Sequence, residues 1–284
     1  MKREEWELQG SNRYKLFARA WLPKESAAKA VVCLAHGQGE HGDRYGRVAE
    51  ALTAEGFITA SMDHYGHGRS DGKRGHMLSM DAAAQDLAAF IEESIRRYPG
   101  LPVFLYGHSM GGNIALRCAI HAKPPLLGMI VTSPWLQLAF RPPAVKEWFG
   151  RRLASILPGL QSSTGLKLED LYRSNEKSHP DDLDDSLLHT LITVKAYTEI
   201  QASGEWLLQQ SSAVNLPMLF VHGTADRVTS YVASERMAAK QGSSCTWVPW
   251  KDGYHELHND KDRVRFLKLV VNWLEQQVQQ STSE

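Results

Sequence analysis

Apolar runs and amphipathic stretches alternate in the first 133 residues of the chain and again after residue 214. Residues 30–35 form a continuous apolar run, which is typical of a strand covered on both faces of a sheet. The stretch that opens at Asp81 has apolar residues at helical spacing and stops at Pro99-Gly100, as helices do. The whole pattern predicts strands at 6–9, 14–22, 30–35, 57–62, 103–106, 126–132, 217–221 and 244–249, and helices at 44–55, 81–98, 113–122, 231–240 and 264–278.

Strands that alternate with helices predict an α/β fold with a mostly parallel sheet covered by helices on both faces. The alternation stops between residues 133 and 214, where no clear strand is found and the pattern predicts a helix at 187–201. We therefore expect a core formed by residues 1–133 and 214–284, with residues 134–213 inserted as a helical cap.

The composition limits the kinds of partner that the protein is expected to bind and the cellular compartments in which it is expected to occur. The chain has 284 residues, and its 32 basic and 32 acidic side chains give a formal net charge of 0, so nothing indicates a nucleic-acid partner. Its cysteines, Cys33, Cys118 and Cys245, lie far apart, which predicts reduced thiols in a cytoplasmic protein. We expect no signal peptide, because the first residues include no apolar segment. No run reaches the ~18 apolar residues of a membrane span, so any membrane contact is expected to be peripheral, and the oligomeric state is left open.

The most informative motif is Gly107-x-Ser109-x-Gly111, which lies between a predicted strand and a predicted helix. A serine on such a tight turn is lifted above the sheet edge, as in a nucleophile elbow. A Cβ at either flanking position would collide with neighbouring backbone in this strained turn. The motif therefore makes Ser109 the candidate nucleophile.

A serine nucleophile needs a base, and the base needs an orienting acid, in the chain order serine, acid, histidine. Asp226 follows the strand at 217–221, and His255 follows the strand at 244–249. Both therefore belong to the carboxyl ends of strands, where functional groups of open α/β sheets gather. We expect Ser109, Asp226 and His255 to form a catalytic triad.

Other residues compete for these roles. Asp252 is close to His255 in sequence but lies on the same loop, so we favour Asp226 as its partner. His258 could exchange roles with His255. We expect His222 to serve backbone geometry at the strand end, and His108 to pack beside the serine.

An oxyanion in acyl transfer is usually held by two backbone N–H groups. One belongs to the residue after the nucleophile, which is Met110, and the other to the loop after the third strand. That loop is His36-Gly37-Gln38-Gly39-Glu40-His41, and Gln38 is its expected donor. The alternative is a turn that only ends the strand.

Histidines also occur in pairs at 36 and 41, 64 and 67, and 255 and 258. None of these pairs has the H-E-x-x-H spacing of a zinc site, and the loops offer no second carboxylate cluster. We expect no metal and no cofactor. The polar residues of 63–70 are expected to pack into a loop under the site.

Five motifs succeed one another along the predicted core. They are His36-Gly-Gln-Gly-Glu-His41 with Arg44-Tyr45, Asp63-His-Tyr-Gly-His-Gly-Arg-Ser70, Gly107-His-Ser-Met-Gly111, His222-Gly-Thr-Ala-Asp226 and His255-Glu-Leu-His258. The chain thereby resembles the monoacylglycerol lipase and lysophospholipase branch of the α/β-hydrolase fold. The resemblance implies the α/β-hydrolase fold, the triad and oxyanion donors named above, and a glycerol-binding end formed by Glu40, Arg44 and His258.

Two features depart from the family. Gln38 is bulkier than the small residue that the family often has there, and the cap is too divergent to transfer its residues. Glu40 and Arg44 have an alternative role as a local ion pair that holds the loop.

The expected function is hydrolysis of a fatty-acyl ester, with monoacylglycerol as the substrate favoured by the resemblance. The alternatives are a lysophospholipase, a carboxylesterase, a serine aminopeptidase that would use Asp181–Asp185 to bind the amine, and a binding module without catalysis. The predicted cap has five apolar residues that we expect to cover the acyl chain. The alternatives are that they form the hydrophobic core of the cap or touch a membrane. They are Trp148, Phe149, Leu153, Ile156 and Leu157.

Overall fold

The centre of the molecule is an eight-stranded sheet with the strand order β1-β2-β4-β3-β5-β6-β9-β10. The computed structural model describes residues 1–24, 27–140, 152–173, 185–210 and 214–282. β2 runs antiparallel to both of its neighbours, and the strands from β4 to β10 run parallel, which confirms a mostly parallel sheet. The strands are β1 (Lys2–Gln9), β2 (Lys15–Leu22), β3 (Ala30–Ala35), β4 (Phe57–Met62), β5 (Val103–His108), β6 (Gly128–Thr132), β9 (Met218–Gly223) and β10 (Cys245–Trp250).

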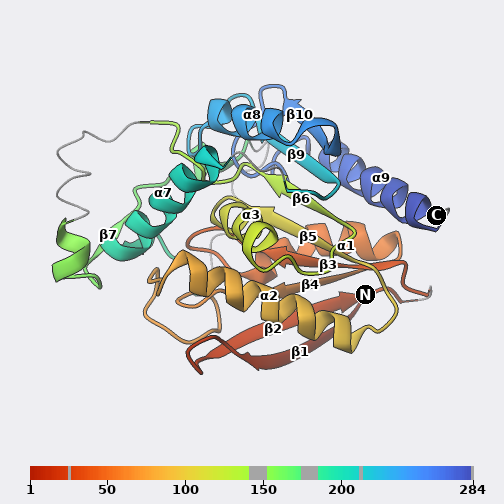
Figure 1. Ribbon diagram of the computed structural model, residues 1–284, viewed down its shortest axis with the longest axis horizontal. Helices are drawn as coiled ribbons and strands as arrows, with labels where there is room; N and C mark the ends of the chain where they lie inside the picture. The colour runs from red at the N-terminus through yellow and green to blue at the C-terminus, as the bar shows by residue number, and fades with distance from the viewer. Residues whose placement is uncertain (25–26, 141–151, 174–184, 211–213, 283–284) are drawn as a thin grey trace.

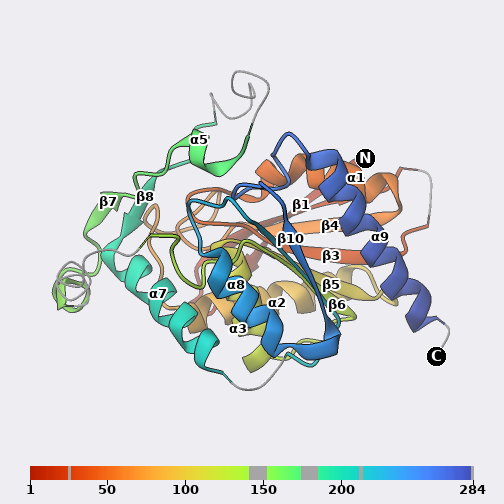
Figure 2. The same ribbon diagram turned by 90° about the horizontal axis from the view of Figure 1, so that it is seen from above.

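Helices cover both faces of the sheet, as Figures 1 and 2 show. One face carries the helices α1 and α9, and the other carries α2, α3 and α8. The helical elements of the core are η1 (Gly42–Tyr45), α1 (Gly46–Ala54), α2 (Met80–Arg97), α3 (Met110–His121), α8 (Tyr231–Lys240), η2 (Gly242–Ser244) and α9 (Arg263–Ser281). The predicted core strands and helices are confirmed, with shifts of a few residues at their ends.

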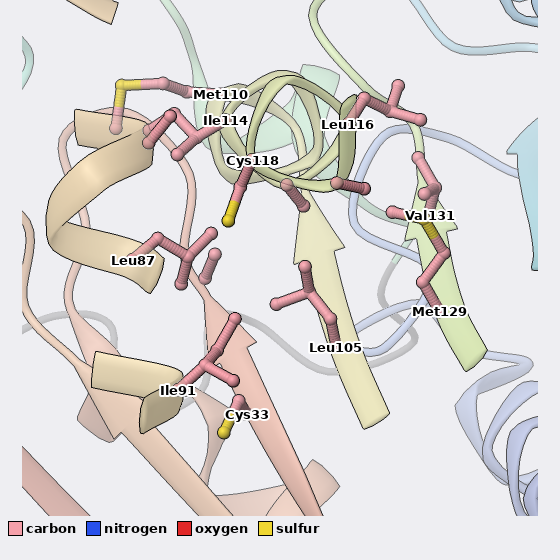
Figure 3. Packing of buried hydrophobic residues seen from close by; sticks show 14 of the residues in the cluster. Cys33, Leu87, Ile91, Leu105, Met110, Ile114, Leu116, Cys118, Met129 and Val131 are labelled. Carbon is pink, nitrogen blue, oxygen red and sulfur yellow. The ribbon is translucent and has the colours of Figure 1, made fainter. Parts of the chain in front are cut away.

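Alternate residues of each central strand point to opposite faces of the sheet and pack in two separate hydrophobic cores. In β3, Val31, Cys33 and Ala35 face α2 and α3, whereas Val32 and Leu34 face α1 and α9. Figure 3 shows the first of these cores. Cys33 of β3 lies next to Ile91 of α2, and the Cys118 side chain points from α3 into the cluster. Burial raises the pKa of both thiols to about 12, so they behave as small apolar side chains.

The segment predicted as a helical cap contains helix α7 (Val194–Gln209), the short helix α5 (Leu168–Leu171) and a two-stranded sheet of β7 (Gln161–Ser163) and β8 (Leu191–Thr193). The expectation of a helix at 187–201 is wrong in its bounds, because Leu191–Thr193 pair with Gln161–Ser163 before the helix begins. The helix starts after Thr193, whose side chain accepts a hydrogen bond from the Ala196 N–H as an N-cap. The division into core and cap at 134–213 stays a prediction.

A buried ion pair joins β2 to the loop after β4. Arg19 and Asp63 are both fully buried, and two nitrogens of the guanidinium each lie 2.6 Å from a carboxylate oxygen. Asp63 also accepts hydrogen bonds from the backbone N–H groups of Gly42 and Arg69. Ser70 donates to the carbonyl oxygen of Asp63 at 2.6 Å. Four polar residues of 63–70 are buried, as the sequence predicts: Asp63, His64, His67 and Ser70. The Arg69 side chain departs from this expectation, because it is 47% exposed.

Replacement of Arg19 by Met tests how much the fold depends on this pair. It leaves the Asp63 carboxylate buried without its cation, and such losses cost about 3–5 kcal/mol of unfolding free energy. The matched control is Lys15→Met, which removes a pair with Glu7 whose side chains are 70% and 62% exposed. That change should cost about 0–1 kcal/mol. Urea denaturation measures both, and equal losses would mean that the backbone donors alone satisfy Asp63.

Candidate active site

Ser109 lies on a sharp turn between β5 and α3. Its φ of 53° and ψ of −120° lie outside the regions that an L-residue ordinarily occupies. The flanking glycines permit the turn: a Cβ on Gly107 would lie 2.7 Å from the Gly111 carbonyl oxygen, and one on Gly111 would lie 2.1 Å from that of Ala35. The predicted reason for both glycines is confirmed. The turn holds the hydroxyl at the carboxyl edge of the sheet.

The loops after β9 and β10 bring Asp226 and His255 to this serine. His255 Nε2 lies 2.9 Å from Ser109 Oγ, and His255 Nδ1 lies 2.8 Å from Asp226 Oδ2. The backbone N–H groups of Val228 and Thr229 donate to Asp226 Oδ1, which fixes the carboxylate. The competitor Asp252 is exposed on its loop. The arrangement has the distances that proton transfer from a serine hydroxyl requires.

The loop 37–40 passes directly beside the serine. A Cβ on Gly37 would lie 3.2 Å from the Cβ of Ser109, and the Gly37 N–H donates to Glu40 Oε1 at 2.5 Å. The side chain of Gln38 extends away from the core and donates to the Leu191 carbonyl oxygen at 3.0 Å. Met110 is the first residue of α3. The two backbone positions predicted to hold an oxyanion therefore flank Ser109.

A cavity of about 850 Å³ opens at Ser109 and His255. Its walls are mostly apolar and include Trp135, Leu138, Leu171, Ile192, Tyr197 and Val228. Of the predicted cap residues, Ile156 and Leu157 are 74% and 53% exposed and line no part of it, so the expectation that they cover this cavity is wrong. Leu153 is half-buried and is also absent from the wall, and Trp148 and Phe149 lie outside the described residues.

Charged residues form one part of the cavity wall. Glu40, Arg44 and Glu256 all line it, and Arg44 Nη2 lies 2.9 Å from Glu256 Oε2 and Nε lies 3.5 Å from Glu40 Oε2. Glu40 and Arg44 therefore lie within ion-pair distance of each other and also form part of the cavity wall. His258 does not line the cavity: its ring is buried and stacks on Tyr45 at 4.7 Å. Sequence reasoning missed Glu256, although its place next to His255 was a usable signal.

The family follows from comparison with known proteins. The chain matches the family described as "Serine aminopeptidase, S33" over residues 26–262. Human monoglyceride lipase is 31% identical over 259 residues, which cover 88% of this chain and 82% of the human protein. The chain belongs to the monoacylglycerol lipase-like family of α/β-hydrolases.

Two further comparisons extend this result. The crystal structure of Paleococcus ferrophilus monoacylglycerol lipase is 29% identical, with a TM-score of 0.79, and the match covers 98% of this chain and 100% of that one. It confirms the predicted α/β-hydrolase fold. An abhydrolase domain-containing protein of Dictyostelium discoideum is 28% identical over 277 residues, which are 96% of this chain but 29% of that protein.

The charges of this monoacylglycerol lipase-like site fit proton transfer. Burial on its own would raise the pKa of Asp226, but His255 and His222 hold it well below its usual range, so it stays a carboxylate. Burial would lower the pKa of His255, but the Asp226 carboxylate raises it above the ordinary value. The imidazolium formed during proton transfer is therefore stabilised.

The other histidines at this edge are buried and neutral. Burial lowers the pKa of His64 to about 4 and that of His67 to about 3, and both rings pack near His36. Burial likewise holds the pKa of His108 well below its usual value, and Thr132 Oγ1 lies 3.1 Å from its Nδ1. His108 thus has the packing position that the sequence predicts. Among the described residues, no group of three or more His, Cys, Asp or Glu side chains could hold a metal ion.

His222 has contacts beyond its expected role in backbone geometry at the strand end. Its Nε2 lies 3.0 Å from Asp226 Oδ2, and its Nδ1 lies 2.7 Å from Ser234 Oγ. A spacing of four residues between histidine and aspartate could have indicated the contact.

The raised pKa of His255 predicts the pH dependence of activity. Only neutral His255 can accept the serine proton, so kcat/KM for a p-nitrophenyl ester should fall as pH drops through a pKa raised above the ordinary histidine value. Asp226→Asn removes the charge that raises this pKa. It should lower the midpoint of the acid limb and reduce kcat by about 10⁴. A wild-type midpoint at or below that of free histidine would contradict the prediction.

Proposed function

We propose that this protein hydrolyses the ester bond of monoacylglycerols and releases a fatty acid and glycerol. The observation that carries the proposal is the contact chain from Ser109 through His255 to Asp226, which opens into a large apolar cavity with charged groups in its wall. An apolar wall with a few polar groups suits a ligand with a long hydrocarbon chain and a small polar end. The names of the human and Paleococcus relatives support the same substrate.

In the proposed reaction, His255 takes the proton of Ser109 while the serine oxygen attacks the ester carbonyl. The backbone N–H groups of Gln38 and Met110 hold the oxyanion. His255 then protonates the departing glycerol oxygen, which leaves the fatty acid bonded to the serine. Water attacks this acyl-enzyme with His255 again as the base. Asp226 holds the imidazole in its tautomer throughout.

The charged part of the wall is proposed to bind the glycerol end. Glu40 and Arg44 line the cavity and can accept from and donate to hydroxyl groups, and Glu256 adds a second carboxylate. His258 is proposed to act from behind by supporting Tyr45, which donates to Glu40 at 2.7 Å. Arg44 lies within ion-pair distance of both glutamates and offsets one of their two negative charges, which leaves less charge for the free amine that an aminopeptidase must bind. Of the acidic run proposed for that role, residues 181–184 lie outside the described residues.

The cap at 134–213 is proposed to cover the acyl chain and to meet a lipid surface. Ile156, Leu157 and Leu160 are apolar and exposed on it, and exposed apolar side chains of this kind suit peripheral contact. No helix in the described part of the chain is long and apolar enough to cross a membrane.

Ser109→Ala tests the proposed nucleophile. It removes the only atom that forms the acyl-enzyme, so monoolein hydrolysis should fall by about 10⁶ and labelling by a fluorophosphonate should vanish. Wild type should label fully. A wild-type protein that neither labels nor cleaves any ester would refute hydrolysis and favour a binding module. Higher kcat/KM on lysophosphatidylcholine or on short p-nitrophenyl esters than on monoolein would replace the substrate but keep the mechanism.

Leu138→Trp tests the acyl cavity. The larger ring should fill part of the wall near Trp135 and Val228, so kcat/KM should fall by about tenfold for a C18 monoacylglycerol and little for a C4 ester. Val232→Trp is the matched control, because Val232 is 59% exposed on α8 and lines no part of the cavity. An equal loss for both chain lengths would place the acyl chain elsewhere.

A further inference from the structure

A second histidine, besides His255, contacts the acid of the candidate triad. His222 is the penultimate residue of β9, the strand whose following loop carries Asp226, and both side chains are fully buried. His222 Nε2 lies 3.0 Å from Asp226 Oδ2, the same oxygen that lies 2.8 Å from His255 Nδ1. The contact does not meet the geometry of a hydrogen bond, so the Nε2–H dipole interacts with the carboxylate electrostatically.

The proton on His222 can be assigned from its two neighbours. An ionised carboxylate can only accept, so Nε2, which faces Asp226, must carry a proton. In a neutral imidazole the other nitrogen is then an acceptor. Ser234 Oγ, on helix α8, lies 2.7 Å from Nδ1 and can donate to it. Ser234 is fully buried as well, so this hydroxyl fixes the tautomer and the orientation of the ring.

We propose that His222 is a positioning residue for the reaction, which holds the Asp226 carboxylate between two imidazoles with its own tautomer set by Ser234. This inference rests on the proposed function only in requiring that His255 be the base. It predicts that the carboxylate shares its charge between His222 and His255. Loss of His222 should therefore loosen Asp226 and leave more of its charge to act on His255.

His222→Leu and His222→Gln separate this role from simple packing. Leu fills much of the space but cannot donate, whereas the Gln side-chain amide can reach and donate to Asp226. In His222→Leu, kcat for p-nitrophenyl butyrate should fall by about tenfold with KM little changed. The midpoint of its acid limb should rise by roughly half a pH unit, because His255 then faces a less neutralised carboxylate. His222→Gln should restore most of kcat and a midpoint near that of wild type.

Other groups that face these residues are unchanged in the His222 variants. Glu40, Glu256, His108 and His258 act on His255, and the ring of Tyr231 lies edge-on to His222 at 6.0 Å. Tyr231→Phe is therefore the control for altered packing around His222 and should leave the pH profile unchanged.

Ser234→Ala keeps the test decisive if His222→Leu fails to fold. It removes the hydroxyl that fixes the ring, so the midpoint should rise in the same direction by a smaller amount. The low-field proton signal of His255 Nδ1 in an NMR spectrum should also move. Equal kcat in the Leu and Gln variants, or an acid limb that stays at the wild-type pH in both His222→Leu and Ser234→Ala, would overturn the inference. The short ester needs no glycerol end, so these outcomes are independent of whether monoacylglycerol is the substrate.

Discussion

The close approach of helix α3 to strand β3 is the constraint on which the site depends. The Cα of Gly111 lies against the carbonyl of Ala35, where a Cβ would come within 2.1 Å of the oxygen. The turn that precedes this contact gives Ser109 its unusual φ of 53°. The loop that continues from β3 runs alongside the serine, so closely that a Cβ on Gly37 would lie 3.2 Å from the Cβ of Ser109. The absence of a side chain at Gly111 therefore lets helix α3, the serine turn and this loop lie close together.

The parallel order of β5, β6 and β9 positions the acid relative to the serine. Ser109 N–H donates to the Thr132 carbonyl and Ser133 N–H donates to that of Val221, so the ends of the three strands are tied in sequence. Thr229 Oγ1 then donates to the Ser133 carbonyl and lies 3.0 Å from Asp226 Oδ2. The carboxylate is therefore fixed by hydrogen bonds that start at the serine turn. Such fixed dipoles stabilise developing charge without reorganisation.

The sequence predicts the core well because its signals are local. A buried strand such as 30–35 shows as an apolar run, and the serine turn shows as glycines at fixed spacing. The cap was predicted poorly because β7 and β8 have three residues each, too few for a period to appear. The contact of His222 with Asp226 and the place of Glu256 in the cavity wall were also missed. The positions in the sequence, four residues before Asp226 and directly after His255, are compatible with these contacts, but the contacts themselves depend on how each loop turns after its strand.

Hydrogen bonds join the loop 37–40 to residues 189–191 of the predicted cap, although the two segments lie far apart in the sequence. The His189 N–H donates to the Gly39 carbonyl, and the Gln38 side chain donates to the carbonyl of Leu191. Within the loop, Glu40 accepts from the Gly37 N–H, so the carboxylate proposed to bind glycerol also holds the turn beside the serine. The side chain proposed to bind glycerol and the loop expected to hold the oxyanion therefore belong to one hydrogen-bonded turn. A change at Glu40 is expected to alter both glycerol binding and the turn beside the serine. Substitutions in the acyl wall or at His222 therefore distinguish the two steps more clearly, because those residues lie outside this turn.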